Sequence, residues 1–178
     1  MDIDSRLDYE RNHFRIKKTP DLTLDYVCWF DGAAQSQGLL SRAGGIIKTI
    51  GNSTYRWTLN CGQGTNTREE LLGLWASLTL AQRINITLLH VLGDSKIIIH
   101  WINLNCNLKV TNLLGWMSKI GEITHSFSNT KFDHIYREEN SEADALSKLA
   151  MQVPEGKIHY NKWQDGHEGP LLSLCLYI

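Results

Sequence analysis

Hydrophobic and polar positions follow a strand-like pattern in three segments near the start of the chain. Residues 25–32 form an apolar and aromatic run that ends in Asp-Gly, a pair typical of turns. Two further β-rich runs cover residues 43–51 and 54–62, with Asn52 and Ser53 between them. Short connections of this kind favour antiparallel pairing. The pattern therefore predicts a three-stranded antiparallel meander.

The period then changes to that of a helix. Apolar residues recur at helical spacing within residues 65–85, and Thr67 followed by Glu70 fits a cap at the start of this helix. The later segments predict a strand at 88–95, helices at 95–105 and 110–126, a strand at 132–137 and a helix from Asn140. Hairpins followed by alternating strands and helices predict an α/β fold, with a mixed five-stranded sheet flanked by helices.

The length of 178 residues suits one compact domain with modest tails. Residues 1–23 mix charges without a period and predict a tail or linker stub, which carries a local basic cluster. Residues 24–151 hold the predicted strands and helices. Residues 152–178 are left as a C-terminal extension of unassigned role.

The overall charge gives no sign of a nucleic-acid partner, because 18 Lys and Arg residues stand against 19 Asp and Glu residues. Four cysteines without a CxxC pair argue against a zinc ribbon and favour reduced thiols in an intracellular protein. The chain shows no signal-peptide core and no apolar run of the roughly 18 residues that span a bilayer. We therefore expect an intracellular protein without a membrane partner, in nucleus or cytoplasm.

Four carboxylates fall at element boundaries rather than on solvated faces. Asp31 closes the first strand, Glu70 lies in the first turn of the first long helix, Asp94 closes the fourth strand, and Asp144 lies near the start of the last helix. Taken singly, each has a plainer explanation as a turn residue, a helix cap, a first-turn acid or a surface residue. Taken jointly, they are expected to meet at one rim of the sheet.

Four converging carboxylates would repel one another unless cations neutralised them. Hard oxygen ligands suit Mg²⁺ or Mn²⁺, and two such ions can activate a water and stabilise the leaving oxygen of a phosphodiester. Two bound divalent ions would change the formal net charge from −1 to about +3. Near neutrality is thus compatible with a polyanionic substrate.

The motifs that hold these acids resemble the type 1 ribonuclease H family, and in particular the RNase H domain of plant retroelement (reverse transcriptase) polyproteins and archaeal-like short-loop members. The resemblance is carried by WFDGAAQ (29–35), AGGIIK (43–48), GTNTREELLGLWASL (64–78), LGDSKIIIHWI (92–102) and HIYREENSEADALSKLA (134–150). It implies an RNase H-like fold for residues 24–151.

The resemblance also implies an activity, namely hydrolysis of the RNA strand of RNA/DNA hybrids by a two-metal-ion mechanism with Mg²⁺ or Mn²⁺. Matched motif by motif, the family's metal-binding carboxylates become Asp31, Glu70, Asp94 and Asp144, with Asp31 bridging both ions. Glu69 occupies the variable position before the family glutamate. The products would carry a 5′-phosphate and a 3′-hydroxyl.

Two residues are candidates for the accessory role that many family members give to a loop histidine. His134 has a spacing to Asp144 found in the members with that histidine, whereas Arg137 has the spacing of the arginine in short-loop members. His134 falls within a predicted strand, so Arg137 is favoured. An arginine cannot act as a base at neutral pH, but it could neutralise phosphate charge or assist product release.

Substrate contacts carried over from the family are Gln37, Thr65, Asn66, Thr67, Ser95 and Lys96. The usual Gly-Asn-Pro-Gly loop is replaced by residues 36–39, and residues 103–118 contain a single basic residue, Lys109, where a basic protrusion would follow the second helix. We therefore expect weak hybrid affinity in isolation. An N-terminal reverse transcriptase domain in a longer polypeptide, or the tail, would then contribute to binding by this expected monomer.

Two alternatives remain beside this hypothesis. A catalytically degenerate RNase H-like module would bind nucleic acid or protein without cleavage, although the presence of all four carboxylates argues against it. A DEDD-type 3′–5′ exonuclease would need Asp-x-Glu on the first strand, and Asp31-Gly32-Ala33 lacks that glutamate.

Overall fold

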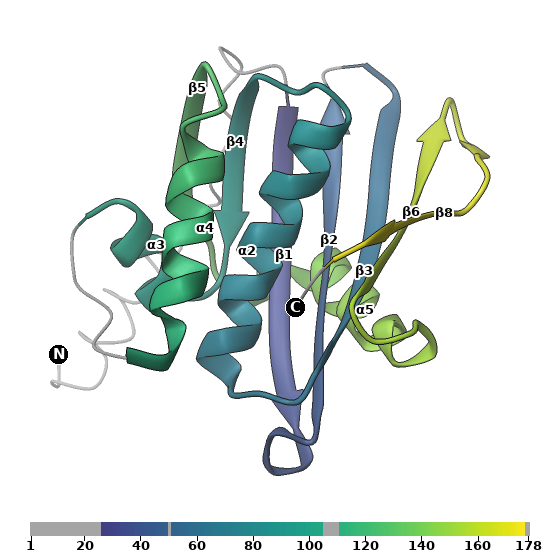
Figure 1. Ribbon diagram of the computed structural model, residues 1–178. Helices are drawn as coiled ribbons and strands as arrows, with labels where there is room; N and C mark the ends of the chain where they lie inside the picture. The colour runs from purple at the N-terminus through teal and green to yellow at the C-terminus, as the bar shows by residue number, and fades with distance from the viewer. Residues whose placement is uncertain (1–25, 50, 105–110, 177–178) are drawn as a thin grey trace, which may run out of the picture.

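The computed structural model describes residues 26–49, 51–104 and 111–176 (Figure 1). The predicted tail with its basic cluster, Cys106 and Lys109 lie outside the described residues. The strands are β1 (Tyr26–Gln35), β2 (Leu40–Thr49), β3 (Ser53–Gly62), β4 (Leu88–Gly93), β5 (Asn129–His134), β6 (Lys157–Gln164), β7 (His167–Glu168) and β8 (Leu172–Cys175). The α-helices are α2 (Asn66–Arg83), α3 (Lys96–Ile102), α4 (Leu114–Thr124) and α5 (Ser141–Leu149). Short 3₁₀ turns cover Ser36–Gly38, Thr111–Leu113, Arg137–Glu139 and Ala150–Gln152.

All eight strands belong to one mixed sheet. Its order is β5-β4-β1-β2-β3-β6-β7, with β8 also paired to β6. The β1–β4 and β4–β5 pairs are parallel, whereas β1–β2, β2–β3 and β3–β6 are antiparallel. The fold class and the antiparallel meander predicted from the sequence are confirmed.

Helices cover both faces of this sheet, with α2 and α4 on one side and α5 on the other (Figure 1). The main core lies between α2 and the sheet, where Phe30, Ile47, Trp57 and Leu59 pack against apolar residues of the helix such as Leu74. This arrangement follows from the helical spacing of the apolar positions in α2. It also fixes the first turn of α2 close to the end of β1.

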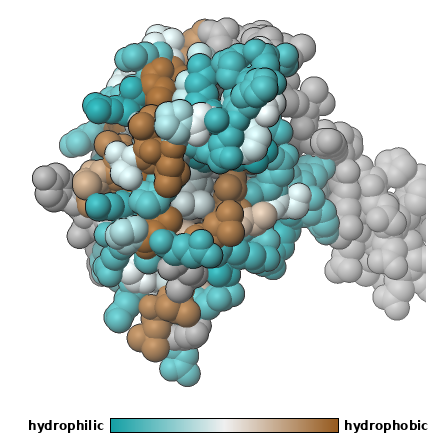
Figure 2. All heavy atoms as spheres, turned by 90° about the vertical axis from the view of Figure 1, so that its right-hand side faces the viewer, coloured by the Kyte–Doolittle hydropathy of each residue, from teal (hydrophilic) through white to brown (hydrophobic). Residues whose placement is uncertain are grey.

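The sheet has three strands more than predicted, and all three lie in the segment left as a C-terminal extension. β6 pairs with β3 from Ile158 to Gln164, and β7 and β8 pair with the other edge of β6. Only Ile158 and Asn161 are buried in β6, so the strand has no clear apolar alternation from which to predict it. On this side of the molecule hydrophobic patches are interspersed with hydrophilic residues (Figure 2).

Several element boundaries differ from the predictions. The residue that caps α2 is Thr65, whose side chain accepts a hydrogen bond from the Arg68 N–H, and the predicted cap at Thr67 is wrong. The strand predicted at 132–137 lies at Asn129–His134, and the chain turns into a 3₁₀ segment at Arg137. These shifts of two or three residues are typical of element ends.

Two further expectations concern thiols and membranes. Cys28, Cys61 and Cys175 are all free thiols, and the first two are buried. Among the described residues, no helix is both long enough and apolar enough to span a bilayer.

Candidate active site

The register of two parallel strands brings Asp31 and Asp94 together. Phe30 of β1 lies beside Gly93 of β4, so that the next residue on each strand is an aspartate. The prediction that Asp31 closes its strand is wrong, because β1 continues to Gln35 beside β2. Only the pairing of β1 with β4 stops at Phe30 and Gly93, and both carboxylates lie where this parallel pairing stops. Asp31 is 7% exposed there.

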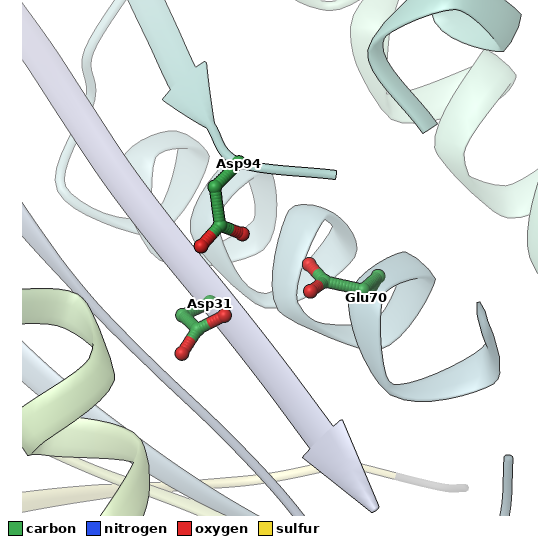
Figure 3. Close-up of side chains that lie close together, drawn as sticks. All are labelled: Asp31, Glu70 and Asp94. Atoms are coloured by element: carbon green, nitrogen blue, oxygen red, sulfur yellow. The ribbon is translucent and has the colours of Figure 1, made fainter. Parts of the chain in front are cut away.

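Glu70 reaches this rim because the first turn of α2 packs directly on β1. A Cβ atom added at Gly32 would overlap the main-chain carbonyl of Glu69. Glycine at this position therefore permits the helix to approach the strand one residue after Asp31. The side chain of Glu70 points from α2 toward Asp31 and Asp94 (Figure 3).

Asp144 is positioned from the opposite face of the sheet by α5. Gly44, the β2 partner of Asp31, lies so close to α5 that a Cβ atom there would overlap the main-chain nitrogen of Ser147. Asp144 is therefore held next to Asp31. Its own Oδ2 lies 2.8 Å from Lys148 Nζ, one turn further along the helix.

Three of the four predicted acids form one compact group. Asp31, Glu70 and Asp94 each offer a carboxylate oxygen, and these oxygens lie within 4.8 Å of one another (Figure 3). Asp144 lies outside this group but interacts with Asp31. The expected convergence is found for Asp31, Glu70 and Asp94, with Asp144 as a neighbour of Asp31, although Asp31 lies within β1 and not at its end.

The electrostatics of the group favour a bound cation. Burial, followed by the charges of Asp94 and Asp144, raises the pKa of Asp31 to about 7. Burial and the charges of Asp31 and Asp94 raise the pKa of Glu70 well above its ordinary value, and burial raises the pKa of Asp94. The pKa of Asp144 is lowered, mainly by its hydrogen bond with Lys148.

The donor set fits a hard divalent cation. Within the described ranges, Glu70 Oε2 is buried without a hydrogen-bond partner, although it lies among other acids. A buried oxygen of this kind is costly unless a cation or a proton satisfies it. Carboxylate oxygens are the ligands preferred by Mg²⁺ and Mn²⁺, so Asp31, Glu70 and Asp94 suit such an ion.

The two candidates for an accessory role occupy different places. Arg137 lies close enough to the acids for its charge to offset part of the raised pKa of Glu70 and Asp94 and to add to the lowered pKa of Asp144. His134 ends β5, with Nε2 3.2 Å from the main-chain oxygen of Asp94. Burial lowers the pKa of His134. The geometry therefore gives Arg137 the electrostatic contact and His134 a main-chain contact.

The predicted substrate contacts fall into two groups. Gln37, Thr65, Asn66 and Thr67 gather where the β1–β2 turn meets the loop before α2, and the two segments are joined by a 2.9 Å hydrogen bond from Gly64 N to Gly38 O. Two of the four also have structural roles: Thr65 caps α2, and Asn66 Oδ1 accepts from the main-chain nitrogen of Ala34. The second group is Ser95 and Lys96, which follow Asp94 at the start of α3.

Sequence reasoning missed the importance of Asn140, which it used only to mark the start of a helix. Asn140 is 1% exposed, and its Nδ2 donates to the main-chain oxygen of Phe30 at 2.8 Å. Its side chain also hydrogen-bonds with Asp94 and offsets part of the rise that burial causes in the pKa of that residue. Asn140 thus links β1, the end of β4 and the helix of Asp144. The feature of the sequence that could have indicated this role is a polar residue at the predicted start of α5.

A second missed residue is Glu69, which was taken for a variable position. It is fully buried, and its Oε1 lies 2.9 Å from Arg68 Nη1. The Arg-Glu-Glu run indicates that one of the two glutamates can pair with the arginine. The sequence alone does not indicate which glutamate pairs with it and which one joins the acidic group.

Comparisons with known proteins place these residues in a wider group. The family described as reverse transcriptase-like matches residues 29–150, a range that contains all four acids and ends before β6. A comparison with curated proteins gave no match.

Several solved structures have the same fold. An RNase H1 from the archaeon Halobacterium salinarum is 21% identical, with a TM-score of 0.64 over 71% of this chain and 97% of its own. The N-terminal RNase H domain of a Mycobacterium tuberculosis protein is 23% identical, with a TM-score of 0.66 over 73% and 95%. LC11-RNase H1, solved with an RNA/DNA hybrid, is 24% identical, with a TM-score of 0.63 over 71% and 96%. The predicted resemblance to type 1 ribonuclease H is confirmed, and the chain has that fold.

Proposed function

The chain belongs to the reverse transcriptase-like family, and on that premise we propose that it is a ribonuclease H, an endoribonuclease that hydrolyses the RNA strand of RNA/DNA hybrids. The observation that carries the proposal is the group of three buried carboxylates on the ribonuclease H fold, with Asp144 beside it. The likeness to LC11-RNase H1, which was solved with an RNA/DNA hybrid, supports this substrate class.

Two divalent ions, Mg²⁺ or Mn²⁺, would supply activation of a water and stabilisation of the leaving oxygen when bound. Asp31 would help to hold both ions, because it is the acid that interacts with both Asp94 and Asp144. Glu70 and Asp94 would hold one side, and Asp144 would complete the other.

The remaining residues of the rim would orient the substrate and adjust charge. Arg137 would attract the scissile phosphate, since its guanidinium already interacts with three of the acids and can pair with phosphate oxygens. The main-chain contact of His134 with Asp94 supports a positioning role rather than proton transfer. Gln37, Thr65, Asn66 and Thr67 would contact the hybrid on one side, and Ser95 and Lys96 on the other.

We further propose that the domain acts intracellularly as part of, or as a descendant of, a retroelement polypeptide in which a reverse transcriptase domain precedes it. The family description supports this origin. The protein would work as a monomer, because all four acids come from one chain. The tail at 1–23 would be the point of connection to the preceding domain.

Cleavage of a labelled hybrid in Mg²⁺ or Mn²⁺ tests the proposed function. The wild-type protein should cut the RNA strand internally, including in substrates blocked at both ends, and Asp94→Asn should not. Asp165→Asn, which changes an exposed acid in the turn between β6 and β7, is the matched control and should cleave normally.

Other results would select an alternative. Equal cleavage by Asp94→Asn would exclude this site. Cleavage restricted to free ends would indicate an exonuclease. Hybrid binding that persists without any divalent-metal binding in calorimetry would indicate a degenerate binding module.

A further inference from the structure

A buried ion pair lies immediately beside the acidic group, on the other side of the first turn of α2. Glu69 has no exposed surface, and Arg68, with a side chain 20% exposed, approaches its Oε1 at 2.9 Å. Arg68 Nη1 also donates to the main-chain oxygen of Cys61 at 3.1 Å. The pair therefore links the helix to the end of β3.

The loop before α2 rests on this pair. Gly64 lies so close that a Cβ atom there would overlap Glu69 Oε1 and crowd the guanidinium of Arg68. The oxygen of Gly64 accepts from Ser41 Oγ at 3.3 Å, and its nitrogen donates to Gly38 O at 2.9 Å. Contact with the pair thus extends from the loop at 62–65 to the β1–β2 turn.

We propose that the Arg68–Glu69 pair is a positioning device that holds the loop at 62–65 and the β1–β2 turn in the arrangement that receives the hybrid. The two segments carry Gln37 and Thr65, and Asn66 follows directly at the start of α2. All three are substrate contacts under the proposed function, and the inference rests on that function. The pair does not touch the reacting phosphate, because Glu69 is wholly buried.

This geometry makes the pair a determinant of substrate binding rather than of the chemical step. Glu70, the next residue, is tied to Asp31 through the approach of α2 to Gly32, a contact made by the main chain of Glu69 and independent of its carboxylate. Loss of the carboxylate should therefore release the loop and leave the acidic group in place. Binding of the hybrid would weaken while turnover at saturation stayed the same.

The test is a steady-state comparison of wild type with Glu69→Gln, which keeps the shape of the side chain and removes its charge. We expect KM for the hybrid to rise about tenfold, with kcat and the Mg²⁺ dissociation constant each within about twofold of wild type. Arg68→Met should reproduce this split. The double variant should be no worse than either single one, because the two residues act as a unit.

Gly64→Ala provides a second variant that displaces the loop and keeps both charges. It should raise KM in the same way, and its effect should shrink in a Glu69→Ala background, where the removed carboxylate makes room for the new methyl group. Glu142→Gln, which changes an exposed ion pair with Lys48, is the matched control and should leave KM unchanged.

Amide hydrogen exchange gives a readout that does not require cleavage. The Gly64 amide, bonded to Gly38, should exchange at least about tenfold faster in Glu69→Gln, while amides of β4 should keep wild-type protection. Unchanged exchange at Gly64, or a fall in kcat with no change in KM, would overturn the inference. A wild-type protein that fails to cut hybrids would instead contradict the proposed function, and the exchange result would still decide whether the pair holds the loop.

Discussion

Two neighbouring glutamates near the start of α2 have opposite surroundings. Burial raises the pKa of Glu69, and the Cys61 thiol, the Arg68 guanidinium and the Ser41 hydroxyl offset part of that rise, with Arg68 Nη1 2.9 Å from Glu69 Oε1. Glu70 lies among Asp31 and Asp94, whose charges raise its pKa further. We call the Arg68–Glu69 pair the compensated region, because the chain itself provides a cation there. We call Asp31, Glu70, Asp94 and Asp144 the acidic region, because acids outnumber cations there.

This difference separates a positioning region from a reactive one. A buried carboxylate without a partner must take up a proton or a cation, because the ionised form is costly in a poorly solvated place. Arg137 offsets part of the charge around Glu70 and Asp94. The remaining excess of negative charge is what divalent ions would neutralise.

The largest expected effect comes from Asp31→Asn, which breaks the acidic region at its centre. Cleavage of the hybrid should fall by at least about 10³-fold, equivalent to ~4 kcal/mol in the barrier. The metal-free variant should also be more stable to urea than wild type at pH 8, because an acid with unfavourable neighbours is removed. A less stable variant that still cleaves would contradict the assignment of Asp31 to a metal site.

In the metal-free protein, the raised pKa of Asp31 should make the free energy of unfolding depend on pH. The pKa of Asp31 is about 7 in the folded chain against 3.8 for the ordinary group, so the folded state binds more protons between these values. Stability from this group is therefore complete below pH 4 and is lost as the pH rises through 7, on the order of a few kcal/mol. Urea unfolding in EDTA at pH 4, 5.5 and 7.5 measures the change.

The contribution of Asp31 is the difference between wild type and Asp31→Asn across this pH series. The lowered pKa of His134 contributes with the opposite sign, since the folded state then binds fewer protons near neutral pH. Saturating Mg²⁺ should reduce the loss at pH 7.5. Identical pH profiles for wild type and Asp31→Asn would show that the surroundings of Asp31 do not disfavour its charge.

Arg68→Met removes the cation of the compensated region, the buried Arg68–Glu69 pair. The variant leaves Glu69 buried without its cation, and breaking a buried pair from one side costs about 3 kcal/mol. Urea unfolding at pH 8, where Glu69 would otherwise be ionised, measures this loss. Addition of Glu69→Gln should restore part of the stability. An Arg68→Met protein as stable as wild type would mean that the pair contributes nothing to holding this turn.

The sequence predicted the acidic region better than the compensated one, for a physical reason. Asp94 directly follows β4, and Glu70 and Asp144 lie near the starts of α2 and α5. Asp31 follows the apolar run of β1, which was recognisable in the sequence although the strand continues to Gln35. The burial of Glu69 depends on the approach of the loop at 62–65, which no local pattern encodes. The role of Asn140 depends on contacts with β1 and β4 that join residues more than 40 positions apart.

The same reasoning applies to the sheet. The five predicted strands contain apolar runs that the core explains, and β1 to β5 are found close to the predicted positions. β6 is largely polar and is held by its register with β3, where Trp57 lies opposite Tyr160 and Arg56 stacks on Trp163 at 4.7 Å. Pairing between distant strands of this kind is set by tertiary contacts rather than by local preference.

Substitution of Arg137 should reduce cleavage more than substitution of His134, by a smaller factor than the changes above. Arg137→Gln removes a charge that favours the ionised forms of three acids, so cleavage at low Mg²⁺ should fall about tenfold, or ~1.4 kcal/mol. His134→Gln, which can keep a hydrogen bond to the Asp94 carbonyl, should fall by about twofold at most. Assays over a Mg²⁺ series measure both, and a larger loss for His134→Gln would reverse the assignment of the accessory role.

The smallest expected effect comes from an exposed pair that matches Arg68–Glu69 in chemistry but not in burial. Lys48 and Glu142 approach at 3.2 Å, with side chains 42% and 57% exposed. Glu142→Gln should change the unfolding free energy by less than ~0.5 kcal/mol, because water already screens both charges and the flexible side chains lose entropy when they pair. Urea unfolding at pH 8, beside Arg68→Met, measures the contrast. If the exposed pair mattered as much as the buried one, ion pairing alone would explain the compensated region. If the exposed pair contributes little, the larger effect of Arg68→Met comes from the burial of Glu69 under the loop. The neighbouring Glu70 then bears the same cost of burying a charge, without a comparable partner.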